Sequence, residues 1–367
     1  MTTCPVCLHS HFETLLKRDG VPVLQNVIVE TVDQALSFPV GKLRICHCHH
    51  CDFVWNADFD PAAIDYDSKY NNSVQSSGVY LAHQARMAER LLSLPGELVC
   101  LEVGCGEGEF LHALNRSGRL RRAIGFDPAH KGVQPLGKNI TILPAYFDEE
   151  VAKTLPADIN VVCSRHTIEH IPSPRPFIKA IADYVRQHNL PLFLETPDVS
   201  WILGNHAFED FFYEHCSLFS PRSMAYLLAE FGLQCRVDVV YGGQYMWIEA
   251  LPAPSSSAIA EELCYWETKV QSLKPEGPVA IWGGASKGVT FSLLIDGFDC
   301  AIDLNQAKQG CFMPVSGMPI VSPETAIARG VQSIIVMNPN YRGEIRAQLD
   351  TMDWSGNLLV LHEHDAR

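Results

Sequence analysis

Residues 163–172 read CSRHTIEHIP and include three side chains that can do chemistry. His166, Glu169 and His170 form the H-x-x-E-H pattern with which one class of peptidases binds zinc. Such a site needs both imidazoles on one face of a regular helix and a third ligand. Three prolines follow within residues 172–176, so we expect at most one helical turn here. The pattern therefore favours a loop whose histidines line a cleft over a zinc hydrolase. The simplest alternative is that Glu169 and His170 only fix the loop.

A second group of reactive side chains lies in the segment FFYEHCSLFSPRSM, at Tyr213, Glu214 and His215. A glutamate–histidine pair beside a phenol hydroxyl is a plausible set for general acid–base catalysis. The alternative is a loop fixed by side-chain hydrogen bonds. We favour catalysis, because the segment is expected in a loop between a buried strand and a helix that begins near Ser220, where functional residues are common.

A glycine-rich turn follows a buried strand in ELVCLEVGCGEGEFLHAL. Residues 98–103 are apolar except for Glu102, and a helix is expected directly after the turn. The turn has glycine at alternate positions, namely Gly104, Gly106 and Gly108. Glycines let the backbone approach a ligand closely at a helix N-terminus. Asp127 ends the next predicted strand, Ala123–Phe126, and an acid there can accept both hydroxyl groups of a ribose. The G-x-G-x-G spacing differs from the G-x-G-x-x-G of nicotinamide sites.

Two C-x-x-C pairs lie near the N-terminus, about forty residues apart. Their members are Cys4, Cys7, Cys48 and Cys51. Each pair offers two thiolates from one tight turn, which is typical of a tetrahedral structural zinc site. Further candidate ligands lie beside the second pair, at Cys46, His47, His49 and His50. Four free thiols are the alternative. Four protein ligands would close the metal site, so we expect a structural zinc ion and not a catalytic one.

The central part of the chain alternates strand and helix patterns from about residue 98 to 250. Further strands are expected within residues 140–147, 159–166 and 190–197. This alternation predicts an α/β fold with a doubly wound parallel sheet. A linker is expected at residues 252–257, where proline and serine are frequent.

The C-terminal part repeats the order of strand, glycine-rich turn and helix. A helix expected at about 258–273 leads into GPVAIWGGASKGVTFSLLI, and further strands follow. The turn is not a P-loop, because Lys287 precedes Gly288 and no G-K-[ST] occurs. Two interpretations stay open for it. The turn either packs its backbone tightly without a ligand, or it places Lys287 near an anionic group.

The composition limits the classes of partner. The 367 residues carry a net charge of -14 and no basic run, so neither nucleic acid nor an anionic membrane surface is an expected partner. No apolar run approaches the ~20 residues that span a bilayer, and residues 1–20 lack the pattern of a signal peptide. Most of the thirteen cysteines lie singly in apolar segments, which predicts reduced thiols and a cytoplasmic protein.

Together, these motifs resemble one family, the zinc-containing, S-adenosylmethionine-dependent C-methyltransferases of nucleotide-linked keto-deoxysugars. The segments LEVGCGEGEF and GFDP are similar to the first two motifs of class I methyltransferases. The segments YEHCSLFS, WGGASKGVTF, IDLNQAKQGCFMP and NPNYRGEI look like signatures of the family itself. The resemblance covers essentially the whole chain. It implies a small-molecule acceptor, namely a nucleotide-linked keto sugar. In the family, a base removes a proton from a carbon next to the ketone, and the resulting enolate attacks the methyl group of S-adenosylmethionine.

The resemblance also implies three domains around a class I methyltransferase Rossmann-like sheet. These are a zinc-binding module at 1–60, an S-adenosylmethionine-binding methyltransferase domain at 61–252 and a smaller Rossmann-like domain at 258–367. A methyltransferase of another small metabolite, acting on carbon or oxygen, is the alternative, and a zinc hydrolase is the remote one.

The resemblance assigns expected roles to particular residues. Those expected in catalysis are Tyr70 (in SKYNNSVQSSG), His170, Tyr213, Glu214 and His215. Those expected to bind S-adenosylmethionine are Glu102, Gly104, Gly106, Gly108, Asp127 and His166. One departure from the family is that Tyr213 directly precedes Glu214, whereas the sugar enzymes have Tyr-x-Glu-His.

Overall fold

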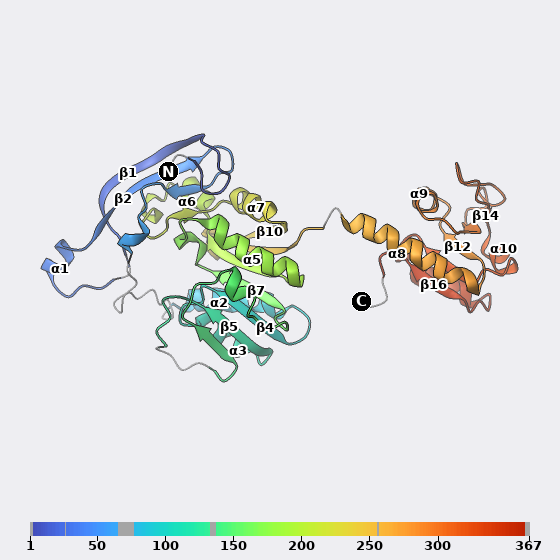
Figure 1. The fold of residues 1–367 in the computed structure, drawn as a ribbon, viewed down its shortest axis with the longest axis horizontal. Helices are drawn as coiled ribbons and strands as arrows, with labels where there is room; N and C mark the ends of the chain where they lie inside the picture. Colours follow the sequence, from blue (N-terminus) through green and yellow to red (C-terminus); the bar gives the residue numbers. More distant parts are fainter. Residues whose placement is uncertain (1–2, 26, 65–76, 133–136, 255–256, 364–367) are drawn as a thin grey trace. The chain divides into compact units, whose positions relative to one another are not determined.

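The computed structural model describes residues 3–25, 27–64, 77–132, 137–254 and 257–363 (Figure 1). Tyr70 lies outside these residues. The chain forms two compact units, Met1–Ala253 and Pro254–Arg367. The boundary falls within the linker that the sequence predicts. No helix in the described ranges has both the length and the apolar character needed to cross a membrane.

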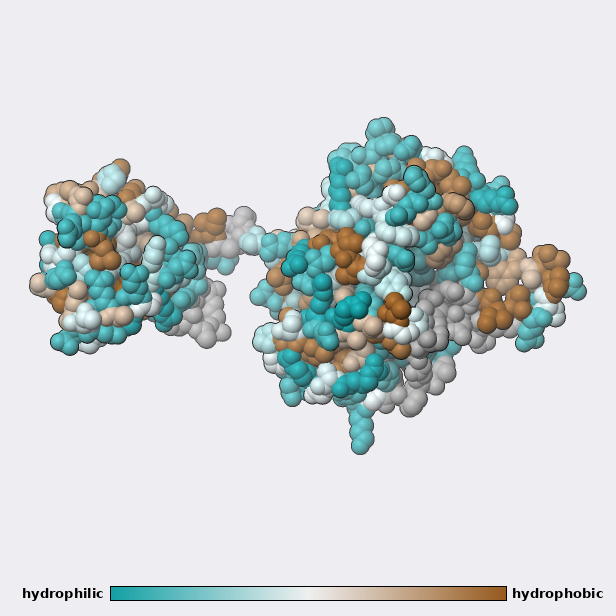
Figure 2. Space-filling model, turned by 180° about the vertical axis from the view of Figure 1, so that it is seen from behind, coloured by the Kyte–Doolittle hydropathy of each residue, from teal (hydrophilic) through white to brown (hydrophobic). Residues whose placement is uncertain are grey.

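The N-terminal segment of the first unit folds into a four-stranded antiparallel sheet. Its strands, in order across the sheet, are β1 (Phe12–Pro22), β2 (Val40–Cys48), β3 (Val54–Asn56) and β9 (Ser217–Leu218). Strand β9 comes directly after the Tyr213–His215 segment, so that segment is joined to the N-terminal sheet. A short helix, α1 (Val32–Leu36), projects from the sheet (Figure 1). Its apolar residues Val32 and Leu36 are exposed, and apolar surface is visible at that end of the first unit in Figure 2.

The centre of the first unit is a seven-stranded sheet of order β10-β11-β8-β7-β4-β5-β6. Five of its strands are parallel, namely β4 (Leu98–Val103), β5 (Leu120–Phe126), β6 (Ile140–Leu143), β7 (Val161–Arg165) and β8 (Leu192–Pro197). The other two form an antiparallel hairpin, β10 (Leu233–Val240) and β11 (Tyr245–Pro252), joined by the turn η4 (Tyr241–Gly243). The sheet is therefore mixed, because a short turn between β10 and β11 cannot make the crossover that a parallel pair needs.

Helices cover both faces of this sheet and bury its apolar strands. Helices α2 (Gly78–Leu92) and α3 (Glu109–Asn115) pack on one face, and α5 (Pro174–His188) and α7 (Pro221–Glu230) pack on the other. Helix α5 illustrates how the sequence directs this packing, because one face of the helix is apolar. Its fully buried side chains recur at helical spacing, at Ile178, Ile181, Ala182 and Val185. Shorter elements connect these layers: η1 (Pro61–Ala63), α4 (Glu149–Ala152), η2 (Ile168–His170), α6 (Val199–Asn205) and η3 (Phe208–Asp210).

The second unit is a five-stranded parallel sheet with helices around it. The strands, in order across the sheet, are β14 (Ile320–Val321), β13 (Cys300–Ile302), β12 (Val279–Trp282), β15 (Ser333–Val336) and β16 (Asn357–Val360). The helices are α8 (Ser257–Leu273), α9 (Ser286–Leu294), α10 (Pro323–Ala328) and α11 (Arg342–Asp350), with short turns at η5 (Lys274–Glu276) and η6 (Pro339–Tyr341).

The strand order of each sheet reverses direction at one place. In the first unit, β5 and β6 are added on one side of β4, and β7 and β8 are added on the other side. In the second unit, β13 and β14 lie on one side of β12, and β15 and β16 lie on the other. In open α/β sheets, ligands bind beyond the carboxyl ends of the strands at such a point. The glycine turns that follow β4 and β12 therefore lie where a ligand is expected.

Candidate active site

The glycine turn after β4 is shaped by backbone that only glycine adopts easily. Gly104 has a φ of +74°, and a Cβ atom there would overlap the side chain of Thr167, which follows β7. Gly106 has a φ of +56° and open space beside its Cα, and Gly108 begins helix α3 with a φ of +83°. The turn thus packs against the loop after β7 on one side and leaves backbone accessible on the other.

Asp127 holds this turn from the end of β5. One carboxylate oxygen, Oδ2, accepts a hydrogen bond from the backbone N–H of Gly106 at 2.7 Å, and Oδ1 accepts one from Ala129 at 2.8 Å. The side chain is therefore fixed beside the glycine turn, at the strand tip where an acid can meet a ribose.

Glu102 is a buried acid that forms no salt bridge among the described residues, although the charge of Arg165 partly offsets the effect of burial on its pKa. Its residue is 2% exposed, and its Oε2 atom has no hydrogen-bond partner among the described residues. Burial raises the pKa of the carboxyl group to about 8, because desolvation disfavours the charged form. A cationic ligand arriving beside Glu102 would supply the missing partner. The ammonium and sulfonium groups of S-adenosylmethionine carry the positive charge that such a partner needs.

The H-x-x-E-H segment does not form a regular helix. His166 has a φ of +48° and lies before the turn, while η2 (Ile168–His170) is a single turn of 3₁₀ helix. The Nδ1 atom of His166 lies 3.4 Å from Oε1 of Glu169, and its backbone N–H donates to the carbonyl oxygen of Glu195 at 2.8 Å. His166 and His170 therefore do not share the helical face that a peptidase zinc site requires.

The structure instead joins His170 with His215, from the second reactive segment. Possible ligand atoms of Glu169, His170 and His215 all lie within 4.8 Å of one another. The two imidazole rings meet edge to face, with centroids 4.9 Å apart and an interplanar angle of 81°. The hydroxyl of Ser217 donates to the carbonyl oxygen of Ile171 at 2.6 Å, which ties the two segments together.

Glu169 and His215 differ in protonation state near neutral pH. Burial alone would raise the pKa of Glu169, but the hydrogen bond from His166 and the nearby imidazoles lower the pKa to about 2. The hydroxyl of Thr196 also donates to Glu169, at 3.0 Å. Burial, together with the charge of His170, lowers the pKa of His215 to about 3. Near neutral pH, Glu169 is therefore ionised and His215 is a neutral imidazole.

The two residues that precede His215 point elsewhere. The hydroxyl of Tyr213 accepts a hydrogen bond from the backbone N–H of Asp60 at 2.9 Å and donates to its carbonyl oxygen at 3.3 Å. The ring is 1% exposed and lies where a Cβ atom on Gly41 would overlap it. Glu214 is also buried, and its Oε1 accepts from the backbone N–H of Gln25 at 3.0 Å. The geometry of Tyr213 argues against its predicted acid–base role, because its hydroxyl serves the backbone.

The structure adds buried residues that the sequence interpretation missed. Glu195, at the end of β8, pairs with Arg165 through two contacts of 2.7 and 2.6 Å and with His83 of α2. Burial alone would raise the pKa of Glu195, but Arg165 lowers the pKa to about 2. Glu195 lies in the carboxyl-terminal half of β8, two residues before the end of the strand, whereas Asp127 directly follows β5.

An aromatic group lies beside this ion pair. Its members come from α2, η4 and β11 and are Tyr80, Tyr241 and Tyr245. Tyr241 and Tyr245 stack with centroids 4.8 Å apart, and the ring of Tyr245 meets the ring of His166 at 4.7 Å. No short sequence pattern marks these tyrosines, because they come together only through the antiparallel hairpin. They place π surfaces next to the loop after β7.

The four cysteines of the C-x-x-C pairs form one compact buried cluster. The Sγ atoms of Cys4 and Cys51 are 3.7 Å apart, those of Cys7 and Cys48 are 3.5 Å apart, and all four lie within 4.8 Å of one another. A tetrahedral site with zinc–sulfur bonds of ~2.3 Å separates its sulfur atoms by about 3.8 Å. The size and donor set of the cluster fit zinc. Cys46 lies apart, with its Sγ 3.7 Å from the hydroxyl of Thr14.

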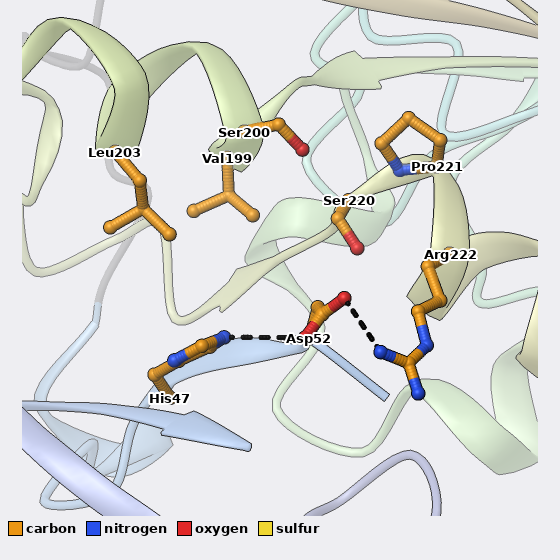
Figure 3. Close-up of a pocket in the computed structure, with 8 residues that line it drawn as sticks. All are labelled: His47, Asp52, Val199, Ser200, Leu203, Ser220, Pro221 and Arg222. Carbon is orange, nitrogen blue, oxygen red and sulfur yellow. Dashed lines mark hydrogen bonds and ion pairs between the residues drawn. The ribbon is translucent and has the colours of Figure 1, made fainter. Parts of the chain in front are cut away.

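A cavity of about 410 Å³ lies between the N-terminal sheet and the first turns of α6 and α7 (Figure 3). The imidazole of His47 and the guanidinium of Arg222 both point toward Asp52, at 3.6 and 3.2 Å (Figure 3). None of the residues that line this cavity is among those predicted for catalysis or for cofactor binding. It therefore shares no lining residue with the site predicted at the carboxyl ends of β4, β5 and β7.

Comparison with known proteins matches both units. The family model described as a methyltransferase domain matches residues 80–236, and the model described as a C-methyltransferase C-terminal domain matches residues 266–361. C-methyltransferase NovU of Streptomyces niveus is 25% identical over 389 aligned residues, which cover 93% of this chain and 90% of that protein.

Similar solved structures cover about half of the chain. They include an O-methyltransferase family protein from Burkholderia thailandensis, with 16% identity, coverage of 48% of this chain and 58% of that chain, and a TM-score of 0.39. They also include the DhpI–SAH complex, with 18% identity, coverage of 49% of this chain and 90% of that chain, and a TM-score of 0.35.

The two family matches agree with the site. The methyltransferase match includes the turn after β4, with Glu102, and also Asp127, His170 and His215. The second match adds a domain described as belonging to C-methyltransferases, and a protein with that activity in its name aligns with nearly the whole chain. The chain is therefore a methyltransferase, and its matches support the C-methyltransferase family.

Proposed function

We propose that this methyltransferase acts on a carbon next to a ketone in a nucleotide-linked keto-deoxysugar, through an enolate. The support comes from the sequence motifs shared with the sugar C-methyltransferases and from the neutral imidazole of His215. His215 lies beside ionised Glu169, on a segment tied to the loop after β7. This arrangement is the observation that carries the proposal, because a general base must be unprotonated and held near the proton that it removes. Burial weakens the basicity of His215, and the negative charge of Glu169 opposes that effect by favouring the imidazolium.

The methyl donor is assigned to the turn after β4. In this proposal the ribose hydroxyls bond to Asp127, and the glycine turn offers its backbone to the amino-acid end of the donor. Glu102, with its free Oε2 atom, faces the positive charge. The loop after β7 packs against this turn, since the hydroxyl of Thr167, the residue after His166, donates to the carbonyl oxygen of Gly104 at 3.2 Å.

His215 is the proposed base. Its neutral imidazole takes the proton from the acceptor carbon, and the electron pair of the broken C–H bond passes into the carbonyl group to give the enolate. The imidazolium that forms is held by the negative charge of Glu169. Bound S-adenosylmethionine supplies an electrophilic methyl group, to which the enolate carbon bonds as the carbon–sulfur bond breaks. His170, whose ring meets that of His215, keeps the base in position.

We propose a positioning role for Glu214 in place of the acid–base role that the sequence predicted. Its carboxylate accepts a hydrogen bond from the backbone of Gln25, which joins the His215 segment to the N-terminal sheet. We therefore assign Glu214 to positioning of the base, and Glu169 to electrostatic support of the imidazolium. The zinc ion proposed for the four cysteines would act structurally, because four thiolates leave no open coordination position.

The experiment is proton exchange without methyl transfer. Nucleoside diphosphate-linked keto-deoxysugars are incubated with the protein in D₂O in the presence of S-adenosylhomocysteine, and deuterium at the carbon next to the ketone is measured by NMR. We expect the native protein to catalyse exchange, and His215→Ala to exchange at least about 100-fold more slowly, as expected for loss of a general base. His188→Ala, which changes a partly exposed histidine near the end of α5, serves as the matched control.

Binding of S-adenosylhomocysteine is measured on the same proteins. His215→Ala should bind S-adenosylhomocysteine within about twofold of the native protein, because the base lies outside the glycine turn. Methyl transfer to an oxygen of the acceptor, without exchange at carbon, would overturn the enolate proposal. Undiminished exchange in a folded His215→Ala protein would remove His215 from the role of base.

A further inference from the structure

A second group of metal-binding side chains lies on the N-terminal sheet, outside the cluster of four cysteines. Its members are Glu13 of β1, His47 of β2 and His49, which directly follows β2. Possible ligand atoms of the three side chains all lie within 4.8 Å of one another. None of the three belongs to the proposed methyl-donor site or to the proposed base, so methyl transfer does not account for this group.

The pairing of β1 with β2 brings the three side chains together. Glu13 lies directly opposite His47 in the antiparallel register. The backbone N–H of His49 donates to the carbonyl oxygen of His11 at 3.2 Å, which extends the pairing past the end of β2. Successive side chains of a strand point to opposite faces. Cys48 therefore joins the cysteine cluster on one face, while the rings of His47 and His49 meet on the other, with centroids 5.6 Å apart.

The spacing of the ligand atoms is close to that of a bound ion. Nδ1 of His47 lies 3.6 Å from Oε1 of Glu13, and Nε2 of His49 lies 4.0 Å from the same oxygen. Zinc bonds of ~2.0–2.2 Å in a tetrahedral site place two such ligand atoms about 3.3 Å apart. The side chain of Glu13 is 53% exposed, so a small rotation of its carboxylate closes the difference.

The other ring nitrogen of His47 faces an acid. Nε2 of His47 lies 3.6 Å from Oδ1 of Asp52, and Arg222 contacts the second oxygen of that carboxylate at 3.2 Å (Figure 3). Histidines that bind a metal usually direct their other ring nitrogen to a carboxylate, which fixes the ring and its tautomer. The contact with Asp52 favours a proton on Nε2 and leaves Nδ1 of His47, on the side of Glu13, as the metal ligand.

We propose that Glu13, His47 and His49 bind a second zinc ion, separate from the one expected at the four cysteines. Two imidazoles and one carboxylate favour such an ion over Mg²⁺ and Ca²⁺, which prefer oxygen ligands. Three protein ligands leave one position open for water, so this ion exchanges more readily than one enclosed by four thiolates. The net charge of -14 favours cations. The proposal goes beyond methyl transfer and does not depend on the identity of the methyl acceptor.

The test uses the full chain after gel filtration, with the zinc of the cysteine cluster confirmed by elemental analysis. Isothermal titration of this protein with ZnCl₂ is expected to show one further zinc ion per chain. An excess of MgCl₂ should change the affinity for that ion by less than about twofold, because the imidazoles discriminate against Mg²⁺. Absence of a further zinc ion, or its displacement by Mg²⁺, would overturn the proposal.

Variants locate the second ion. Glu13→Gln and His49→Ala each remove one ligand and should weaken its binding at least about tenfold, since loss of even an orienting partner costs about 10- to 100-fold. Asp52→Asn keeps all three ligands and should weaken binding about tenfold through the orientation of His47. Asp52 has a φ of +62°, which asparagine tolerates. His50→Ala is the matched control, because it removes an exposed imidazole of the same loop that lies outside the group.

Two readouts separate loss of the ligand from loss of the fold. In all four variants the zinc of the cysteine cluster and the affinity for S-adenosylhomocysteine should be unchanged. Glu13→Gln alters an exposed side chain of β1, so it gives an independent result if Asp52→Asn disturbs the neighbouring cysteines. Unchanged binding of the second ion in both Glu13→Gln and His49→Ala, or an equal loss in His50→Ala, would refute the assignment.

Discussion

Binding of S-adenosylmethionine is expected to weaken about 90-fold when the pH falls from 9 to 6, because of Glu102. The carboxyl group has a pKa of about 8 in the unliganded protein, since burial disfavours its charged form. Only the ionised form attracts a cationic ligand. A group with that pKa is about 91% ionised at pH 9 and about 1% ionised at pH 6, and the apparent affinity follows the competent fraction. The ratio of these fractions gives the change expected from Glu102. The ammonium group of the donor also titrates near pH 8, so the contribution of Glu102 is the difference between the pH dependence of the native protein and that of Glu102→Gln.

The assay is isothermal titration with S-adenosylmethionine between pH 6 and pH 9. Glu102→Gln should bind weakly at every pH and lose the part of the slope that Glu102 causes, because an amide does not titrate. Glu97→Gln changes an exposed acid just before β4 and should keep the native slope. A native affinity that varies less than about threefold over this range, or the same slope in Glu102→Gln, would refute the reasoning.

The same ionisation has an effect on stability with a definite sign. The unfolded chain releases the proton of Glu102 near the ordinary glutamate pKa, whereas the folded protein keeps it up to about pH 8. Between these values the folded state binds more protons, so raising the pH destabilises the unliganded fold. The full shift corresponds to roughly 5 kcal/mol at most. Glu102→Gln should therefore be more stable than the native protein at pH 9, and the difference should shrink toward pH 5 in thermal unfolding.

Three further predictions concern the metal, the glycine turn and the base. Cys51→Ser should lose zinc by elemental analysis and lower the Tm by at least about 5 °C, whereas Cys46→Ser should keep one zinc ion per chain. Gly104→Ala should abolish donor binding and destabilise the fold by more than about 3 kcal/mol in denaturant unfolding. Gly118→Ala, with a similar φ of +73° but nothing beside it, should cost only about 1 kcal/mol. Because the pKa of His215 is lowered to about 3, kcat at saturating donor should show no loss from protonation of the base between pH 8 and about pH 5. A fall centred near the ordinary histidine pKa of ~6.5 would contradict this.

The parts of the site that could be predicted from sequence are those encoded locally. An apolar run, three glycines and a helix pattern are consecutive in the chain, so the turn after β4 could be placed without knowing the rest of the fold. Asp127 followed from the same argument applied to the next strand. The two C-x-x-C pairs carried their spacing with them, and the structure brings those four thiols together and leaves Cys46 outside.

The parts that could not be predicted depend on pairing between distant segments. The antiparallel direction of β11 brings Tyr245 to the carboxyl end of β8, next to His166, and nothing near Tyr245 in the sequence specifies that pairing. His83 reaches Glu195 only because α2 packs on that part of the sheet. Tyr213 was predicted beside the base, but the hydroxyl turns toward the backbone of Asp60, since the local pattern does not fix side-chain direction in a loop.

The buried acids of the first unit divide the work of the site according to their partners. Glu169 and Glu195 are buried as deeply as Glu102, yet the pKa of each is lowered to about 2, because imidazoles or a guanidinium compensate its charge. Glu102 makes no salt bridge among the described residues, and its pKa rises because burial outweighs the charge of Arg165. The uncompensated acid is therefore the one beside the glycine turn, where a cationic donor gains most from an unpaired carboxylate. The compensated acid Glu169 lies beside His215, where a fixed negative charge can support an imidazolium. In the proposed mechanism, exchanging these environments would leave the donor without an attractive charge and the base without support, so we expect the placement of cations around each acid to decide its function.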